Sequence, residues 1–183
     1  MNLDLPTLTF KTLEEAQNYV KAGVLTASGV YCPCCGQKAK VYSRKLNSTI
    51  AHGLIHIDKY FKQNPHTEWV HMLNLFTRLR ICKTNEGALL AHWGLIEAKE
   101  GEKEDGNPHV GLWKITENGK KFVAGRLLMP EKVILYDGRV LGFSEKKAHI
   151  IECLGKKFNY DELMSPVIAD NISASLPNTS SPH

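Results

Sequence analysis

One segment in the middle of the chain constrains the fold more than any other, because it predicts helix, strand, turn, strand and helix in that order. Thr84 or Asn85 can cap the first helix, and Gly94 can end it. A charged tip separates the two strands, and Thr116 can cap the helix that follows them. The expected elements are a helix at 84–93, a strand at 95–98, a tip at 99–109, a strand at 110–115 and a helix at 116–123. This order is that of a winged helix-turn-helix.

The N-terminal part of the chain predicts a short helix followed by two short strands. Thr12 and Glu15 have the spacing of a capping box at the start of a helix over 12–22. Strands are expected at 30–31 and 40–42, on either side of a cysteine-rich turn.

A longer amphipathic helix is expected between this turn and the central segment. Asn47 or Ser48 can cap it, and its apolar residues recur at helical spacing. Pro65 ends the helix, because proline lacks the backbone N–H that a continuing helix needs.

A β-hairpin is expected after the central segment. The pair Asp137-Gly138 lies between apolar runs at 132–136 and 139–143, and such a pair between two strands is typical of a tight hairpin turn. Ser144 can cap a helix after the hairpin.

Three of the five cysteines lie together in the run Cys32-Pro33-Cys34-Cys35-Gly36. Two thiolates separated by two residues can bind one ion across a tight turn, and glycine adopts the backbone conformation that such a turn needs. In a reducing compartment, clustered cysteines favour a metal over a disulfide. The sequence therefore predicts a structural zinc ion held by Cys32 and Cys35.

A zinc knuckle supplies two of the four ligands of a tetrahedral ion, so two more are needed. His52 and His56 are the nearest candidates, since their spacing places both on one face of the expected helix. A redox role for the cysteine pair has less support, because redox pairs of the thioredoxin kind begin a helix. Alternative ligands are Cys34, His71, Cys82 and Cys153.

These predictions together describe an α+β chain: a winged helix-turn-helix with an N-terminal zinc knuckle and a C-terminal β-hairpin-helix appendage. The end of the chain is rich in Pro, Ser, Asn and Thr, which is typical of disorder. The expected divisions are an N-terminal helical segment at 1–29, the zinc knuckle at 30–45, the winged-helix domain at 46–126, the appendage at 127–164 and a disordered tail at 165–183.

Two runs of residues carry a family resemblance, HWGLIE at 92–97 and LWKITENGK at 112–120. They resemble the end of the recognition helix and the wing of MarR-like proteins, in which a Gly-Leu-Ile strand and a Leu-Thr-x-x-Gly element occur. Here Ile115 replaces the leucine of that element. The resemblance covers roughly residues 46–125 and implies DNA binding and a homodimer. The chain also resembles a group of small phage-encoded proteins that have a Cys-x-x-Cys-Gly turn before such a wing.

Charge is distributed unevenly along the chain. Residues 30–83 carry nine Lys or Arg against two acidic residues, a balance of +7, whereas residues 84–117 have a balance of −4. A basic block indicates an oriented partner such as double-stranded DNA, although an ordinary solvated surface would have the same composition. The residues expected to bind DNA are Arg44, Lys45, Arg78, Arg80, Lys83, Asn85 and His92.

The tip of the expected wing favours a different partner. Residues 99–105 contain four acidic residues and two lysines, so DNA phosphates would repel this tip. The alternative function is therefore a phage accessory protein that binds and inhibits a host or defence protein. The residues of this second candidate surface are Glu102, Glu104 and Asp105.

The sequence gives little support to catalysis or to a membrane location. The chain contains no P-loop and no Gly-x-Ser-x-Gly, His-Glu-x-x-His or Gly-x-Gly-x-x-Gly motif, so we expect a non-enzymatic protein without catalytic residues. No apolar run approaches the roughly 20 residues needed to cross a bilayer. The N-terminus also lacks the pattern of a signal peptide, so a cytoplasmic regulator of transcription without a membrane partner is expected.

Overall fold

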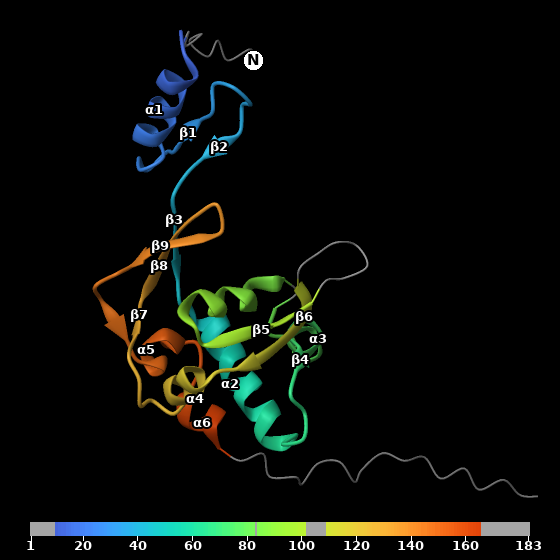
Figure 1. The fold of residues 1–183 in the computed structure, drawn as a ribbon. Helices are drawn as coiled ribbons and strands as arrows, with labels where there is room; N and C mark the ends of the chain where they lie inside the picture. The colour runs from blue at the N-terminus through green and yellow to red at the C-terminus, as the bar shows by residue number, and fades with distance from the viewer. Residues whose placement is uncertain (1–9, 83, 102–108, 166–183) are drawn as a thin grey trace, which may run out of the picture.

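The structure, a computed structural model, describes residues 10–82, 84–101 and 109–165. Helices combine with small antiparallel sheets in a mixed α+β fold (Figure 1). None of the helices in these ranges is long and apolar enough to cross a bilayer. The elements, in chain order, are α1 (Leu13–Gly23), β1 (Val30–Tyr31), β2 (Lys38–Ala39), β3 (Tyr42–Lys45), α2 (Ser48–Gln63), β4 (Val70–His71), α3 (Met72–Arg78), the 3-10 helix η1 (Asn85–Trp93), β5 (Ile96–Glu100), β6 (His109–Ile115), α4 (Glu117–Val123), β7 (Met129–Pro130), β8 (Lys132–Tyr136), β9 (Arg139–Phe143), β10 (Lys147–Ala148), α5 (Ile150–Leu154) and α6 (Tyr160–Met164).

Three parts of the molecule can be distinguished in Figure 1. The arm comprises residues 10–41, with α1, β1 and β2. The neck is the three-stranded sheet of β3, β8 and β9. The body contains the remaining elements and most of the buried apolar side chains.

Helix α2 is the central element of the body, since η1, α4, α5 and β6 all pack against it. The side chains of Ile50, Leu54 and Ile57 are fully buried, which confirms the predicted apolar face. The side-chain oxygen of Asn47 accepts hydrogen bonds from two backbone N–H groups, at 3.0 and 3.1 Å. Asn47 is therefore the N-cap, and Ser48 is the first residue of the helix.

A three-stranded antiparallel sheet in the body has the strand order β4-β6-β5. Its central strand is β6, in which Trp113 pairs with Val70 of β4 and with Ala98 of β5. The sequence predicts β5 and β6, but it does not predict β4 or the helix α3 that follows it. Two residues of β4 are too few to produce a periodic pattern.

The helix predicted at 84–93 is present as a 3-10 helix over Asn85–Trp93. Gly87, Leu90 and Trp93 are buried, and their spacing of three residues places them on one side of a helix with three residues per turn. Burial of this side in the body therefore favours the tighter helix. Gly94, with a φ of 65°, ends it as predicted, whereas the side chain of Thr84 makes no capping hydrogen bond.

The neck joins segments that lie far apart in the sequence. Strand β3 pairs antiparallel with β8, so that Arg44 lies opposite Val133, and β8 pairs with β9. Asp137 and Gly138 form the tight turn between β8 and β9, with φ angles of 49° and 71°, which confirms the predicted hairpin. The sequence does not predict that β3 is the third strand of this sheet.

The arm is a small unit that projects from the neck, away from the body (Figure 1). Thr12 Oγ1 accepts a hydrogen bond from the N–H of Glu15 at 3.2 Å, so Thr12 caps α1 as predicted. Ala16 of α1 and Val30 of β1 are buried, and the two elements are in contact.

The strand predicted at 40–42 is wrong in its position, because Lys40 and Val41 belong to no strand. Strand β2 ends at Ala39, and β3 begins at Tyr42. Between them, the N–H of Val41 donates to the carbonyl oxygen of Val24 at 3.2 Å. This bond turns the chain away from β1 and into the neck.

Ser144 does not cap a helix, and that prediction is wrong. Its hydroxyl accepts a hydrogen bond from the N–H of Lys132 and donates one to the carbonyl oxygen of Lys146, both at 3.0 Å. Ser144 therefore closes the open end of the β8–β9 hairpin. Helix α5 begins later, after His149, whose N–H donates to Glu152 Oε2 at 2.7 Å.

Candidate metal knuckle and nucleic-acid interface

The turn between β1 and β2 has the backbone of a knuckle. The N–H of Cys32 donates to the carbonyl oxygen of Gln37, and the N–H of Gly36 donates to the carbonyl oxygen of Cys32, both at 2.8 Å. Gly36 has a φ of 70°, a conformation that favours glycine. The local sequence therefore folds into the tight turn that the spacing of the cysteines predicts.

The thiol of Cys32 lies in surroundings that favour a thiolate. Backbone N–H groups of Cys34 and then Cys35 form hydrogen bonds with it and lower its pKa. Burial raises the pKa of the Cys34 thiol, and the neighbouring Cys32 raises it further. Cys32 is half-buried and Cys35 is exposed to solvent, and a zinc ion held by these two thiols stays a prediction.

The structure does not bring the two predicted histidine ligands to this turn. His52 and His56 lie on α2 in the body, whereas the cysteines lie in the arm (Figure 1). Across the described ranges, no group of three or more His, Cys, Asp or Glu side chains is placed to hold a metal ion. The alternative ligands His71, Cys82 and Cys153 also belong to the body.

The histidines instead form a pair of their own. Their Nε2 atoms are 3.0 Å apart, and the ring of His52 stacks on Phe158 with ring centroids 4.1 Å apart. Burial, followed by the charges of His56 and Lys157, lowers the pKa of His52 to about 4. Burial also lowers the pKa of His56. Both rings are therefore neutral near pH 7, so one Nε2 donates to the other.

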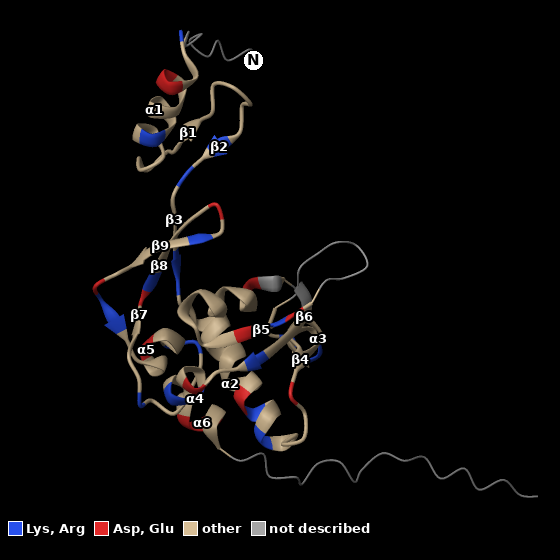
Figure 2. Ribbon diagram, in the orientation of Figure 1, with Lys and Arg blue, Asp and Glu red and all other residues tan. Residues whose placement is uncertain are grey.

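Basic and aromatic side chains gather where the arm meets the neck. Figure 2 shows positive residues on β2, on the link to β3 and on β3 itself. A hollow of about 430 Å³ lies there, between the knuckle and the tip of the β8–β9 hairpin. Its polar and aromatic lining includes Lys38, Lys40, Tyr42, Tyr136 and the single acidic residue Asp137.

Two cation–aromatic pairs extend this surface. The ammonium nitrogen of Lys38 lies 5.5 Å from the ring centre of Tyr31, and the guanidinium carbon of Arg44 lies 5.3 Å from that of Tyr42. The two tyrosines are 57% and 44% exposed, so their rings are accessible to a ligand. We call Tyr31, Lys38, Lys40, Tyr42 and Arg44 the arm–neck surface.

The other basic residues predicted to bind DNA are dispersed. Lys45 forms an ion pair with Glu131 at 2.8 Å, which balances its charge. Arg78 ends α3, and Arg80 follows it with a φ of 54°; α3 lies on the opposite side of the body from the neck in Figure 1. Lys83 lies outside the described residues. Of the residues predicted to bind DNA, only Arg44 therefore belongs to the arm–neck surface.

Helix η1 is poorly suited to hold DNA phosphates. Its sequence NEGALLAHW contains no Lys or Arg, and its first turn contains Glu86. Asn85 begins the helix, and burial lowers the pKa of His92 near its end, so His92 is neutral near pH 7. The three buried residues of η1 face the body. This leaves η1 with few polar side chains for contacts with DNA, and none of them is a lysine or an arginine.

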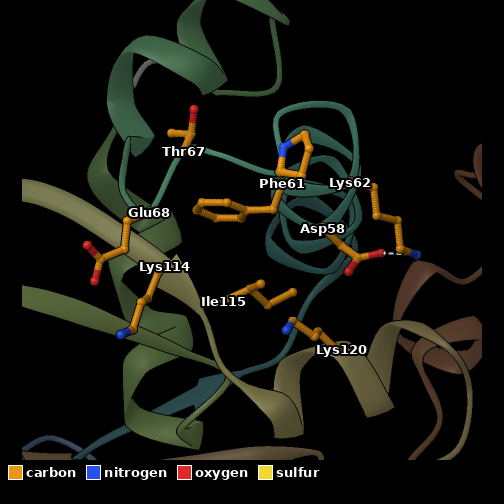
Figure 3. A pocket seen from close by; sticks show the side chains of 9 residues that line it. Asp58, Phe61, Lys62, Thr67, Glu68, Lys114, Ile115 and Lys120 are labelled. Carbon is orange, nitrogen blue, oxygen red and sulfur yellow. Dashed lines mark ion pairs between the residues drawn. The ribbon is translucent and has the colours of Figure 1, made fainter.

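A second hollow, of about 490 Å³, opens beside α2 and β6 (Figure 3). Asp58 lines it and is the only charged side chain buried within the described ranges. The ammonium nitrogen of Lys62 lies 2.6 Å from Asp58 Oδ2, and the two side chains form an ion pair. Lys114 and Lys120 pair with Glu97 and Glu117 at 2.6 and 2.7 Å. The charge of each of these lysines is therefore balanced by an acidic residue of the same chain. The sequence alone does not predict the hollow.

The acidic wing residues Glu102, Glu104 and Asp105 lie outside the described residues, as does the predicted tail beyond Ser165.

A comparison of the chain with protein-family models, curated proteins and solved structures finds no match. No relative therefore assigns a role to any residue of the knuckle, the arm–neck surface or the body.

Proposed function

We propose that this chain is a cytoplasmic, non-enzymatic DNA-binding regulator, and that its arm–neck surface provides the main contacts with the phosphate backbone. The observation that carries the proposal is the clustering of Lys38, Lys40 and Arg44 with two exposed tyrosines. Cations bind phosphates, and exposed aromatic rings stack on bases, so this combination is typical of nucleic-acid interfaces.

A winged-helix body is part of this proposal. The order α2-β4-α3-η1-β5-β6 and the strand order β4-β6-β5 support it, because they are the order and pairing of a helix-turn-helix followed by a two-stranded wing. In this arrangement η1 occupies the place of the recognition helix. Its lack of cations means that it would contribute shape and a few polar contacts, while the arm–neck surface would supply the charge.

A structural zinc ion held by Cys32 and Cys35 also belongs to the proposal. Zinc would fix the β1–β2 turn and thereby the positions of Tyr31 and Lys38, which lie opposite each other on the two strands. Loss of zinc would therefore weaken DNA binding through the geometry of the arm.

Fluorescence anisotropy with labelled random-sequence duplex and single-stranded DNA tests the proposal at about 50 and 200 mM salt. We expect micromolar binding at the lower salt, and a steep loss at the higher salt. The double variant Lys40→Glu/Arg44→Glu should abolish binding, since each lost phosphate contact lowers the salt slope by about one. The matched control Arg78→Glu/Arg80→Glu makes the same change of charge on the other side of the body and should bind nearly as the unaltered protein does. Equal losses in both double variants would contradict the placement, and no binding at either salt would contradict DNA binding.

A protein partner is the second candidate function, and β9 is the observation that favours it. This strand is an edge of the neck sheet and exposes Val140, Leu141 and Phe143 at 41%, 57% and 46%. An exposed edge can pair with an extended segment of another protein. Binding of a protein partner at this edge would depend little on salt concentration. The variant Leu141→Lys would weaken this binding and would leave the anisotropy measured with DNA unchanged. The acidic wing stays a further proposed contact for such a partner.

A further inference from the structure

The knuckle presents half of a zinc site. It contributes two thiols within one turn. Cys34 lies in the same turn and Asp137 lines the same hollow, but among the described residues no group of three or more His, Cys, Asp or Glu side chains is placed to hold a metal ion. Structural zinc sites are almost always closed, with four protein ligands in a tetrahedron. Something other than the described part of one chain must therefore supply the second pair.

We propose that two copies of this chain share one zinc ion, each copy supplying the Sγ atoms of Cys32 and Cys35. This inference rests on the zinc knuckle of the proposed function. A symmetric pair of knuckles gives four thiolates, which is the ligand set of a closed tetrahedral site. It also gives a closed two-fold arrangement, the commonest symmetry of oligomers.

The position of the knuckle permits this arrangement. The β1–β2 turn belongs to the arm, outside the body (Figure 1), and its two cysteines line the hollow that reaches Tyr136 and Asp137 of the neck hairpin. Cys35 is exposed and Cys32 is half-buried, so a second knuckle can approach without moving any element of the body. The β1 and β2 strands have two residues each, so the arm offers little surface for a dimer that lacks the metal.

The charges around the knuckle also fit a shared ion. Four thiolates and one Zn²⁺ carry a net charge of −2, which needs nearby cations. Lys38 and Lys40 line the same hollow as Cys32 and Cys35, so two copies would bring four ammonium groups to the site. The N–H groups of Cys34 and Cys35 already form hydrogen bonds with the Cys32 thiol in each copy. Cys34 itself is not needed as a ligand.

A zinc-linked pair would change how the protein meets DNA. Each copy carries one arm–neck surface close to its knuckle, so the ion would hold two such surfaces next to each other. Binding of the second surface then becomes intramolecular and raises the overall affinity by about 10²- to 10⁴-fold. Zinc would thus control both oligomeric state and DNA affinity.

The first test measures mass by light scattering and zinc by elemental analysis on the full chain, in a phosphine reductant that prevents disulfides. We expect twice the monomer mass of 20.5 kDa, with about one zinc ion for every two chains. Chelation should return the monomer. The variant Cys32→Ser should lose both the zinc and the dimer, whereas Cys34→Ser and His52→Ala should keep both. One zinc ion per monomer, or a dimer that survives chelation, would overturn the shared site.

Cobalt titration of the unaltered protein provides a second measurement that does not depend on a variant. Four-thiolate Co²⁺ should absorb in the visible and saturate at about one ion per two chains. Saturation at one ion per chain would again overturn sharing, and no uptake of cobalt or zinc would overturn the knuckle itself. DNA anisotropy of the monomeric Cys32→Ser variant separates these outcomes from the proposed function. Weak, salt-sensitive binding by this variant would leave DNA binding intact, whatever the zinc stoichiometry.

Discussion

The indole Nε1–H of Trp93 donates a hydrogen bond to the carbonyl oxygen of Pro130 at 2.8 Å. This bond joins the end of η1 to β7, immediately before the neck hairpin. The Trp93 side chain is buried and Pro130 is half-buried, so the hydrogen bond is partly shielded from solvent. The orientation of η1 and the path of the chain into the neck are therefore coupled through one side chain.

The variant Trp93→Phe should lower the free energy of unfolding by about 1 kcal/mol, because it removes the donor of a partly buried hydrogen bond. Urea denaturation followed by circular dichroism measures the change. Trp69→Phe is the matched control. Trp69 is half-buried, and the centre of its ring lies 4.8 Å from the ammonium nitrogen of Lys114. A control that loses as much stability as Trp93→Phe would contradict the role of the hydrogen bond.

The cap of α2 gives a second prediction. Asn47→Ala removes an oxygen that accepts two backbone N–H groups and should cost about 1 kcal/mol of stability. Ser48→Ala, one residue later, should change stability by less than about 0.5 kcal/mol, because Ser48 is the first helical residue and not the cap. Thermal or urea unfolding of both variants checks this, and the reverse order of their effects would contradict it.

The histidine pair predicts a dependence of stability on pH. The pKa of His52 is lowered from 6.5 to about 4, so the folded state favours the neutral ring and the unfolded chain binds the proton at a higher pH. The resulting stabilisation is fully present above pH 6.5 and is lost as the pH falls towards 4. We expect the urea midpoint to fall over this range, and to fall less in His52→Gln. A variant with the same pH profile as the unaltered protein would argue against His52 as the source.

Tyr42 gives a prediction that separates stacking from charge. Tyr42→Ala should weaken single-stranded DNA binding by about 1 to 3 kcal/mol, the range for one stacked base, while its salt slope stays unchanged. Leu73→Ala, which removes an exposed apolar side chain from α3, is the control and should bind as the unaltered protein does. A change of salt slope in Tyr42→Ala would mean that the ring acts mainly by positioning Arg44.

Local signals in the sequence predicted the parts of the fold that depend on local chemistry. Thr12 and Thr116 cap their helices, and Asp137 and Gly138 form the hairpin turn, because the hydrogen bonds and φ angles involved are settled within a few residues. The tight turn around Gly36 is also determined locally, whereas its use as a zinc knuckle stays a prediction.

Tertiary packing determined the parts that the sequence could not predict. The 3-10 form of η1 follows from the burial of Gly87, Leu90 and Trp93 in the body. Helix propensities carry no information about this burial. Ser144 has a good capping side chain, but Lys132 and Lys146 offer it backbone partners across the hairpin. The arm–neck surface depends on a strand pairing between distant segments, so its residues could not be grouped from their positions in the chain.

The pairing of β3 with β8 imposes an order on folding during synthesis. Tyr42 leaves the ribosome well before Leu135, its partner across the sheet. Until β8 emerges, the arm has no rigid attachment to the body, and β3 is an unpaired edge rich in Tyr, Arg and Lys. The body is also incomplete at that point, because α5, which packs against α2, follows the neck hairpin in the sequence. A chain that stops before Lys132 would therefore lack α5 as well as β8 and β9, and would lose part of the core of the body together with the surface that we propose for DNA.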